Sequence, residues 1–101
     1  IGLDGLLFMF MLSCFIISYD LRAPYRDYNL LYNAIRSYGT WGRLTESTWA
    51  IVAVSSAEQV RNYLMQYIDG NDRLVVVKGG KEAAWIRAIA NNDWLQQNLA
   101  L

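Results

Sequence analysis

The sequence predicts an α+β fold in which a four-stranded antiparallel sheet carries two helices on one face. Apolar segments rich in β-branched and aromatic residues occur at 12–19, 40–54 and 73–78, and such segments are typical of strands. Two segments with apolar residues at helical spacing separate them. The 101 residues, 54 % hydrophobic and 18 % charged, suffice for one domain with one core and are unlike a disordered chain.

The first strand and the first helix are predicted within residues 12–38. Residues 12–19 (LSCFIISY) form the strand, and a charged turn ends it. Asp27 is placed to cap the helix that follows, and Gly39 is placed to end it. The buried face of this helix consists of apolar side chains at helical spacing, namely Leu31, Ala34, Ile35 and Tyr38.

A hairpin and the second helix come next. The stretch TWGRLTESTWAIVAV has the polar cluster 45–47 between two strand-like pieces, which predicts a hairpin or a bulged pair of strands. Ser55 and Glu58 match a capping box, so we expect a helix to begin there. Turn-forming residues at 69–72 end this helix. Its buried stripe consists of Val60, Leu64, Tyr67 and Ile68.

A fourth strand and a helical tail complete the order. Residues 73–78 (RLVVVK) predict the strand, and two glycines follow it. Trp85 and Ile89, four residues apart, predict a helix from Lys81 onwards. After a break at 91–93, a short last helix carries Trp94 and Leu99. We divide the chain into an N-terminal extension, a domain and a C-terminal helical extension, at residues 1–10, 11–78 and 79–101.

The apolar start of the chain needs its own interpretation. It resembles a membrane segment in length, but Asp4 interrupts it, no basic residue precedes it, and it merges into a strand-like run. We therefore expect no membrane partner. We expect the natural start to be Met9 or Met11, so that the residues before it are extension sequence.

Composition excludes several classes of active site. The chain contains no histidine, so serine–histidine and cysteine–histidine nucleophilic sites and histidine metal ligands are excluded. Catalysis would have to rest on carboxylates with a hard metal ion, or on Tyr, Lys or Arg. The formal net charge is zero, so no global field favours nucleic acid. The one cysteine, Cys14, is expected to be a buried apolar side chain in a cytoplasmic protein.

Both faces of the predicted sheet are apolar. In the first strand Phe15, Ile17 and Tyr19 alternate with Cys14 and Ile16. The second face of such a sheet normally meets water and is polar, so something must cover this one. A second copy of the chain would cover it in a two-fold homodimer, and the C-terminal helices would cover it within one chain. The sequence leaves both possibilities open.

The order of elements is β-α-β-β-α-β, which is the ferredoxin-like pattern. Five segments in this order, SYDL, SYGTW, TESTWAIVAV, SSAEQVRNYLMQYID and DRLVVVK, resemble the small Cas-two family of CRISPR-associated proteins. The virulence-associated protein D toxins share the same layout. The resemblance covers residues 12–78, and the tail from Gly79 departs from it.

The resemblance implies a homodimer that acts on nucleic acid. In that family the aspartates after the first strand face each other across the two-fold axis and hold a divalent metal ion for phosphodiester hydrolysis. The matching residue is Asp20, which would be the catalytic residue and the ligand of Mg²⁺ or Mn²⁺. Arg22, Arg26 and Arg43 would bind the phosphates of RNA or DNA. Other members of the family are structural, so a non-catalytic dimeric adaptor that binds nucleic acid is the alternative.

Three further interpretations stay open. Asp20 could simply end the strand, with Arg22 or Arg26 as its salt-bridge partner. An RNA-recognition module has the same strand order, but it needs a basic and aromatic motif on its third strand, and STWAIVAV has one tryptophan and no basic residue. A small-molecule regulatory domain of this topology is also consistent with the sequence.

Overall fold

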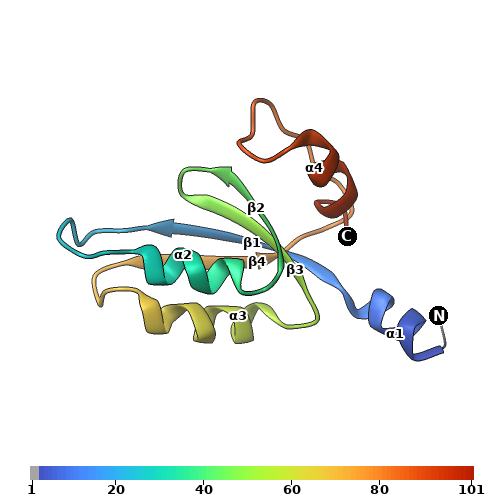
Figure 1. Ribbon diagram of the computed structural model, residues 1–101, viewed down its shortest axis with the longest axis horizontal. Helices are drawn as coiled ribbons and strands as arrows, with labels where there is room; N and C mark the ends of the chain where they lie inside the picture. Colours follow the sequence, from blue (N-terminus) through green and yellow to red (C-terminus); the bar gives the residue numbers. More distant parts are fainter. Residues whose placement is uncertain (1–2) are drawn as a thin grey trace.

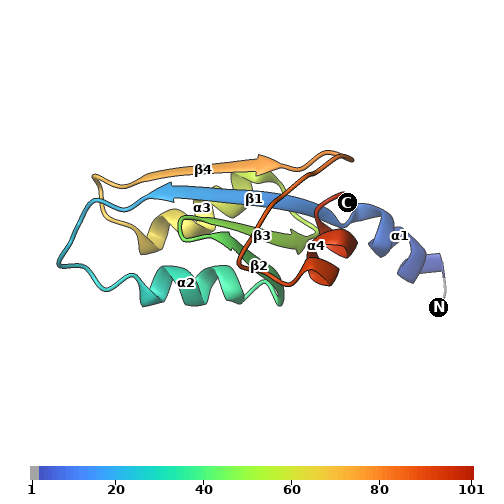
Figure 2. The same cartoon turned by 90° about the horizontal axis from the view of Figure 1, so that it is seen from above.

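Four strands form one antiparallel sheet in the order β2-β3-β1-β4. The computed structural model describes residues 3–101 and shows helices α2 and α3 on one side of this sheet and the C-terminal tail on the other (Figures 1 and 2). The elements are α1 (Leu3–Met11), β1 (Ser13–Asp20), α2 (Asn29–Arg36), β2 (Thr40–Thr45), β3 (Thr48–Ala53), α3 (Ala57–Leu64), the 3₁₀ turn η1 (Met65–Tyr67), β4 (Arg73–Lys78) and α4 (Asn92–Asn98). The predicted α+β fold with a four-stranded antiparallel sheet is confirmed.

Strand β1 lies inside the sheet because its side chains are apolar on both faces. Ile17 stands opposite Trp49 of β3 and Val76 of β4, and all three belong to the core that α2 and α3 cover. The buried members of this first core are Phe15, Ile17, Tyr19, Leu31, Ala34, Ile35, Trp49, Ile51, Val60 and Leu64. They include one of the two apolar faces predicted for β1 (Phe15, Ile17 and Tyr19) and most of the buried residues predicted for the two helices.

The two helices begin close to their predicted starts. The capping box of α3 consists of Ser56 and Gln59, one residue later than the predicted pair Ser55 and Glu58. Either serine fits the sequence pattern, and the extended backbone of Ser56 decides between them. Asp27, the predicted cap of the first helix, accepts a hydrogen bond from the Asn29 amide at 2.9 Å, but α2 begins one residue later than a cap at Asp27 would place it. The N-cap is Tyr28, whose side chain makes no capping hydrogen bond.

The C-terminal tail covers the second face of the sheet over β2 and β3. Leu95 and Leu99 of this tail pack with Cys14, Ala50 and Val52 in a second buried cluster. Of the two covers that the sequence left open, the structure therefore shows the intramolecular one for this half of the face. Gly42 of β2 permits the approach, because a Cβ atom there would lie 2.6 Å from the Trp94 ring.

The tail is less helical than predicted. Residues 81–91 form no helix, and α4 (Asn92–Asn98) is the tail's one helical segment. Arg87 has φ 52°, a left-handed conformation that a right-handed helix does not contain. The amides of Ile89 and Ala90 donate to the carbonyls of Leu44 and Arg43, so this part of the tail pairs with edge strand β2 instead.

The other half of the second face is open. On β4, Val75 and Val77 are 56 % and 53 % exposed, and their cross-strand partners on β1 are Ser18 and Ile16. We refer to Ile16, Ser18, Val75 and Val77 as the open strip. It runs along β1 and β4 on the face where the tail covers β2, β3 and the start of β1 at Cys14.

Helix α1 occupies most of the predicted N-terminal extension. It projects beyond the start of β1, away from the sheet (Figures 1 and 2). Leu6, Leu7 and Phe8 are more than half exposed on it. Residues 1 and 2 of the extension lie outside the described part of the chain. Among the residues that the structure describes, no helix is long and apolar enough to cross a membrane.

Candidate functional site

Asp20 ends β1 at one tip of the sheet, as the sequence predicted. It stands opposite Arg73 in the register of β1 and β4, and its Oδ2 lies 3.4 Å from Nη1 of Arg73. The predicted salt-bridge partners Arg22 and Arg26 were therefore wrong. The side chains of Asp20 and Arg73 are 56 % and 70 % exposed, and an exposed pair of this kind contributes about 0–1 kcal/mol. The Asp20 carboxylate could therefore exchange this ion pair for a ligand at little cost in stability.

Arg22 and Arg26 lie in the loop between β1 and α2, which Asp72 anchors. The Asp72 carboxylate accepts hydrogen bonds from the amides of Arg22 (2.6 Å) and Asp69 (2.7 Å) and from the Tyr28 hydroxyl (2.7 Å). Partial burial pushes the pKa of Asp72 upwards, but these hydrogen bonds outweigh it and hold the pKa below its usual value. The backbone of Arg22 is thus fixed while the Arg22 and Arg26 side chains remain exposed.

Arg43 projects from β2 over the aromatic side of the first core. Its guanidinium carbon lies 4.9 Å from the centre of the Trp49 ring and 5.2 Å from that of Tyr32, which are cation–π contacts. Nη2 donates to the Glu46 carbonyl at 2.6 Å. Nε is buried and has no hydrogen-bond partner among the described residues. The guanidinium is therefore held in one place with unused donor capacity.

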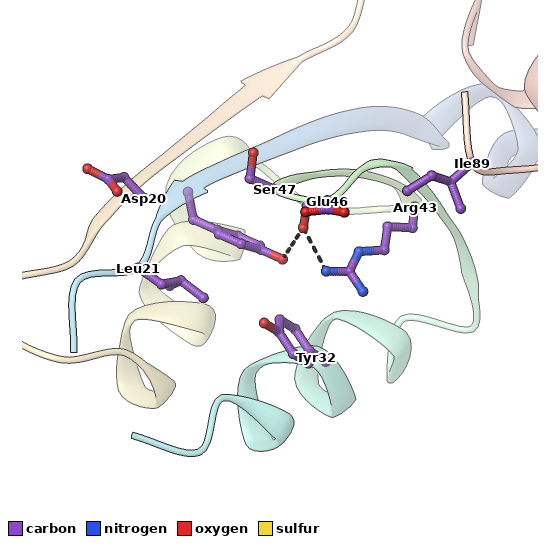
Figure 3. Close-up of a pocket in the computed structure, with 8 residues that line it drawn as sticks. Asp20, Leu21, Tyr32, Arg43, Glu46, Ser47 and Ile89 are labelled. Atoms are coloured by element: carbon purple, nitrogen blue, oxygen red, sulfur yellow. Dashed lines mark hydrogen bonds between the residues drawn. The ribbon is translucent and has the colours of Figure 1, made fainter. Parts of the chain in front are cut away.

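A pocket of about 670 Å³ joins Asp20 and Arg43. Tyr19 and Leu21 come from the end of β1, Tyr32 from α2, and Glu46 and Ser47 from the hairpin turn (Figure 3). The Tyr19 hydroxyl accepts from Trp49 Nε1 at 2.9 Å and donates to the Glu46 carbonyl at 3.1 Å. Burial raises the pKa of Tyr19, so this hydroxyl stays protonated. We call this space the Arg43 pocket.

The structure separates the predicted site residues into two groups. Asp20 and Arg43 line one pocket, whereas Arg22 and Arg26 lie on the loop that Asp72 anchors. The sequence did not point to Arg73, Asp72 or Tyr32 as site residues. Arg73 and Asp72 could be found only from the pairing of β1 with β4, since they are more than 40 residues away from Asp20 and Tyr28 in the chain. For Tyr32, the signal available was its helical spacing within a buried face.

One chain offers no ready metal site in its described part. No group of three or more Cys, Asp or Glu side chains there could hold a metal ion. At the tip of β1 the chain supplies the single exposed carboxylate of Asp20, with Arg73 beside it. A hard cation normally needs further oxygen ligands from protein, water or substrate. A metal ion at Asp20 would therefore require ligands from outside this chain.

Comparison with known proteins gives no independent assignment. The chain matches no model of a known protein family, and no solved structure matches it. The resemblance to the Cas-two family thus stays a prediction from the sequence.

Proposed function

We propose that this protein is a ferredoxin-like homodimer that acts on nucleic acid. The strand order β2-β3-β1-β4, with α2 and α3 between the strands in sequence and on one face of the sheet, supports the ferredoxin-like classification. A single, buried cysteine, Cys14, supports a cytoplasmic protein. The absence of histidine supports chemistry that depends on carboxylates.

The position of Asp20 relative to the open strip carries the proposal. Cross-strand pairs share a face of a sheet, so Asp20 and Arg73 continue the row formed by Ser18 with Val75 and Ile16 with Val77. Two copies that pack through this strip would bury the exposed valines and bring two Asp20 side chains towards one axis. The same surface would then provide the dimer contact and the paired carboxylates.

The donor set fits Mg²⁺ or Mn²⁺ only in such a pair. Two Asp20 carboxylates with water and phosphate oxygens make an oxygen shell that these ions accept. A bound metal ion would polarise a phosphate and lower the pKa of a bound water. The exposed guanidinium groups of Arg22 and Arg26 would hold flanking phosphates, because the Asp72 anchor fixes the backbone that carries them.

The ion pair of Asp20 with Arg73 favours a second candidate function. An arginine 3.4 Å away already neutralises the carboxylate, which competes with a metal ion. In this case the dimer binds nucleic acid without cleaving it and acts as a structural adaptor. Arg73 would then contribute to nucleic-acid binding together with Arg22 and Arg26.

A cleavage assay distinguishes the two functions. Labelled single-stranded RNA and double-stranded DNA are incubated with the protein in Mg²⁺, Mn²⁺ or chelator, beside Asp20→Asn and the control Glu58→Gln. Glu58 is an exposed acid on α3, so its replacement removes one carboxylate away from the site. Metal-dependent cleavage lost only in Asp20→Asn supports the nuclease, and binding without cleavage in all three proteins supports the adaptor. Light scattering that shows a monomer at micromolar concentration would contradict both.

A further inference from the structure

The Arg43 pocket has the chemistry of a base-binding site. We propose that it binds an unpaired guanine of single-stranded nucleic acid. The inference rests on the proposed function and names its substrate class. The Arg43 pocket has a volume of about 670 Å³, which is ample for one nucleobase with its sugar, since small-molecule sites span roughly 300–1,000 Å³.

The Arg43 guanidinium is pre-organised to donate hydrogen bonds to a ligand in this pocket. Two aromatic rings and the Glu46 carbonyl hold its guanidinium, so little side-chain entropy remains to be lost on binding. Arg43 and Tyr32 reach towards the same space from β2 and α2 (Figure 3). An acceptor edge, such as O6 and N7 of guanine, matches a guanidinium.

The charges that line the pocket argue against a bare phosphate. Glu46 contributes one negative charge and Arg43 one positive charge, whereas the Asp20 carboxylate points away from the other lining residues (Figure 3) and pairs with Arg73, so the formal sum is zero. Such a lining has no surplus positive charge to bind a phosphate dianion, and it suits a neutral ligand that accepts from arginine and donates to a carboxylate. The carboxylate available is that of Glu46, because Arg73 pairs with Asp20 and the Glu46 side chain makes none of the contacts that hold Arg43 and Tyr19.

Guanine meets both requirements at once. It presents acceptors at O6 and N7 and donors at N1 and N2, and a carboxylate accepts from two adjacent donors. Leu21 and Tyr32 supply apolar and aromatic surface for the ring. The Watson–Crick edge must be free for the contact with Glu46, so the nucleic acid has to be single-stranded.

Binding can be measured without cleavage. We would record fluorescence anisotropy in chelator with labelled eight-nucleotide RNAs made of uridine alone or with one central guanosine, adenosine or inosine. A single guanosine avoids pairing between strands. We expect the guanosine RNA to bind about tenfold or more tighter than the adenosine RNA, and inosine, which lacks the N2 amino group, to fall between them.

Variants assign this preference to the pocket. Glu46→Gln should abolish the difference between guanosine and inosine while affinity for the uridine RNA stays unchanged. Arg43→Gln should remove the preference for guanosine, and Glu58→Gln should keep it. The Glu46 contacts that stabilise the fold come from its main-chain carbonyl, so Glu46→Gln is expected to fold even if Arg43→Gln does not.

The outcomes separate this inference from the proposed function. Equal affinity for all four RNAs, failure to bind any of them, or a guanosine preference that Glu46→Gln leaves intact would overturn the guanine site. Dimerisation and cleavage that depends on Asp20 would still support the proposed function in that case. A guanosine preference lost in the Glu46 and Arg43 variants would support the site even where no RNA is cleaved.

Discussion

Replacing Gly42 with alanine tests how the tail is held on the sheet. The added Cβ atom would lie 2.6, 2.8 and 3.0 Å from three atoms of the Trp94 ring. Ordinary carbon contacts are about 3.5–4.0 Å, so the ring has to retreat by about 1 Å. Overpacking of this kind costs roughly 1–3 kcal/mol. Because 1 kcal/mol shifts the Tm of a domain of this size by about 4–8 °C, we expect Tm to fall by roughly 5–20 °C.

Thermal unfolding followed by circular dichroism measures this shift. The matched control is Gly80→Ala, since a Cβ atom at Gly80 meets nothing within 4 Å, and its Tm should stay within about 2 °C of wild type. Trp94→Ala removes the ring that clashes. In that background, adding Gly42→Ala should cost much less than it does alone, because residues in contact are not additive.

Two results would refute the reasoning. Gly42→Ala that melts with wild type would mean that the tail does not lie against β2 at this point. An equal loss of stability in the presence and absence of Trp94 would mean that the clash is not with this ring.

Three further predictions concern Asp72, Asp20 and Cys14. Asp72→Asn should lower the free energy of unfolding by about 1–3 kcal/mol at pH 7, because it weakens hydrogen bonds to a charged acceptor. Since the pKa of Asp72 is lowered in the folded protein, this stabilisation is present above the pKa of the unfolded chain and is lost as pH falls through the pKa of the folded protein. Urea unfolding at pH 7 and 3.5 should therefore show a smaller stability difference between wild type and Asp72→Asn at the lower pH. The same difference at both pH values would contradict this. Asp20→Asn should change stability by no more than about 1 kcal/mol in the same assay, and a larger loss would reveal a structural role. Burial raises the pKa of Cys14 to about 11, so a disulfide reagent at pH 8 should modify it only on unfolding, and fast modification of the native protein would refute its burial.

Local patterns predicted the elements of the sheet well. The alternation around Ile17 and the polar turn at Glu46 and Ser47 depend on neighbours in the chain, and both occur as predicted. The helix predicted from Lys81 failed because Ile89 makes its hydrogen bond to Leu44, a strand residue far away in the sequence. Helical spacing cannot show that an edge strand competes for the same amide.

The site was predicted less completely than the fold. Asp20 was placed correctly at the end of the first strand, since the apolar run ends there. Its partner Arg73 depends on which strands are adjacent and in what register, and no local pattern contains that information. The pocket lined by Asp20 and Arg43 has the same origin, because residues from β1, α2, the β2–β3 hairpin and the C-terminal tail line it.

The two edges of the sheet differ in a way that limits how copies can assemble. Hydrogen bonds from Ile89 and Ala90 occupy the outer strand β2 at Leu44 and Arg43, whereas β4 has β1 as its one partner strand. A sheet that can be extended at both edges can add copy after copy and grow into a fibre. A sheet that can be extended only along β4 is self-limiting, because joining two copies there consumes both growing ends. The tail thus favours a closed pair over an endless polymer.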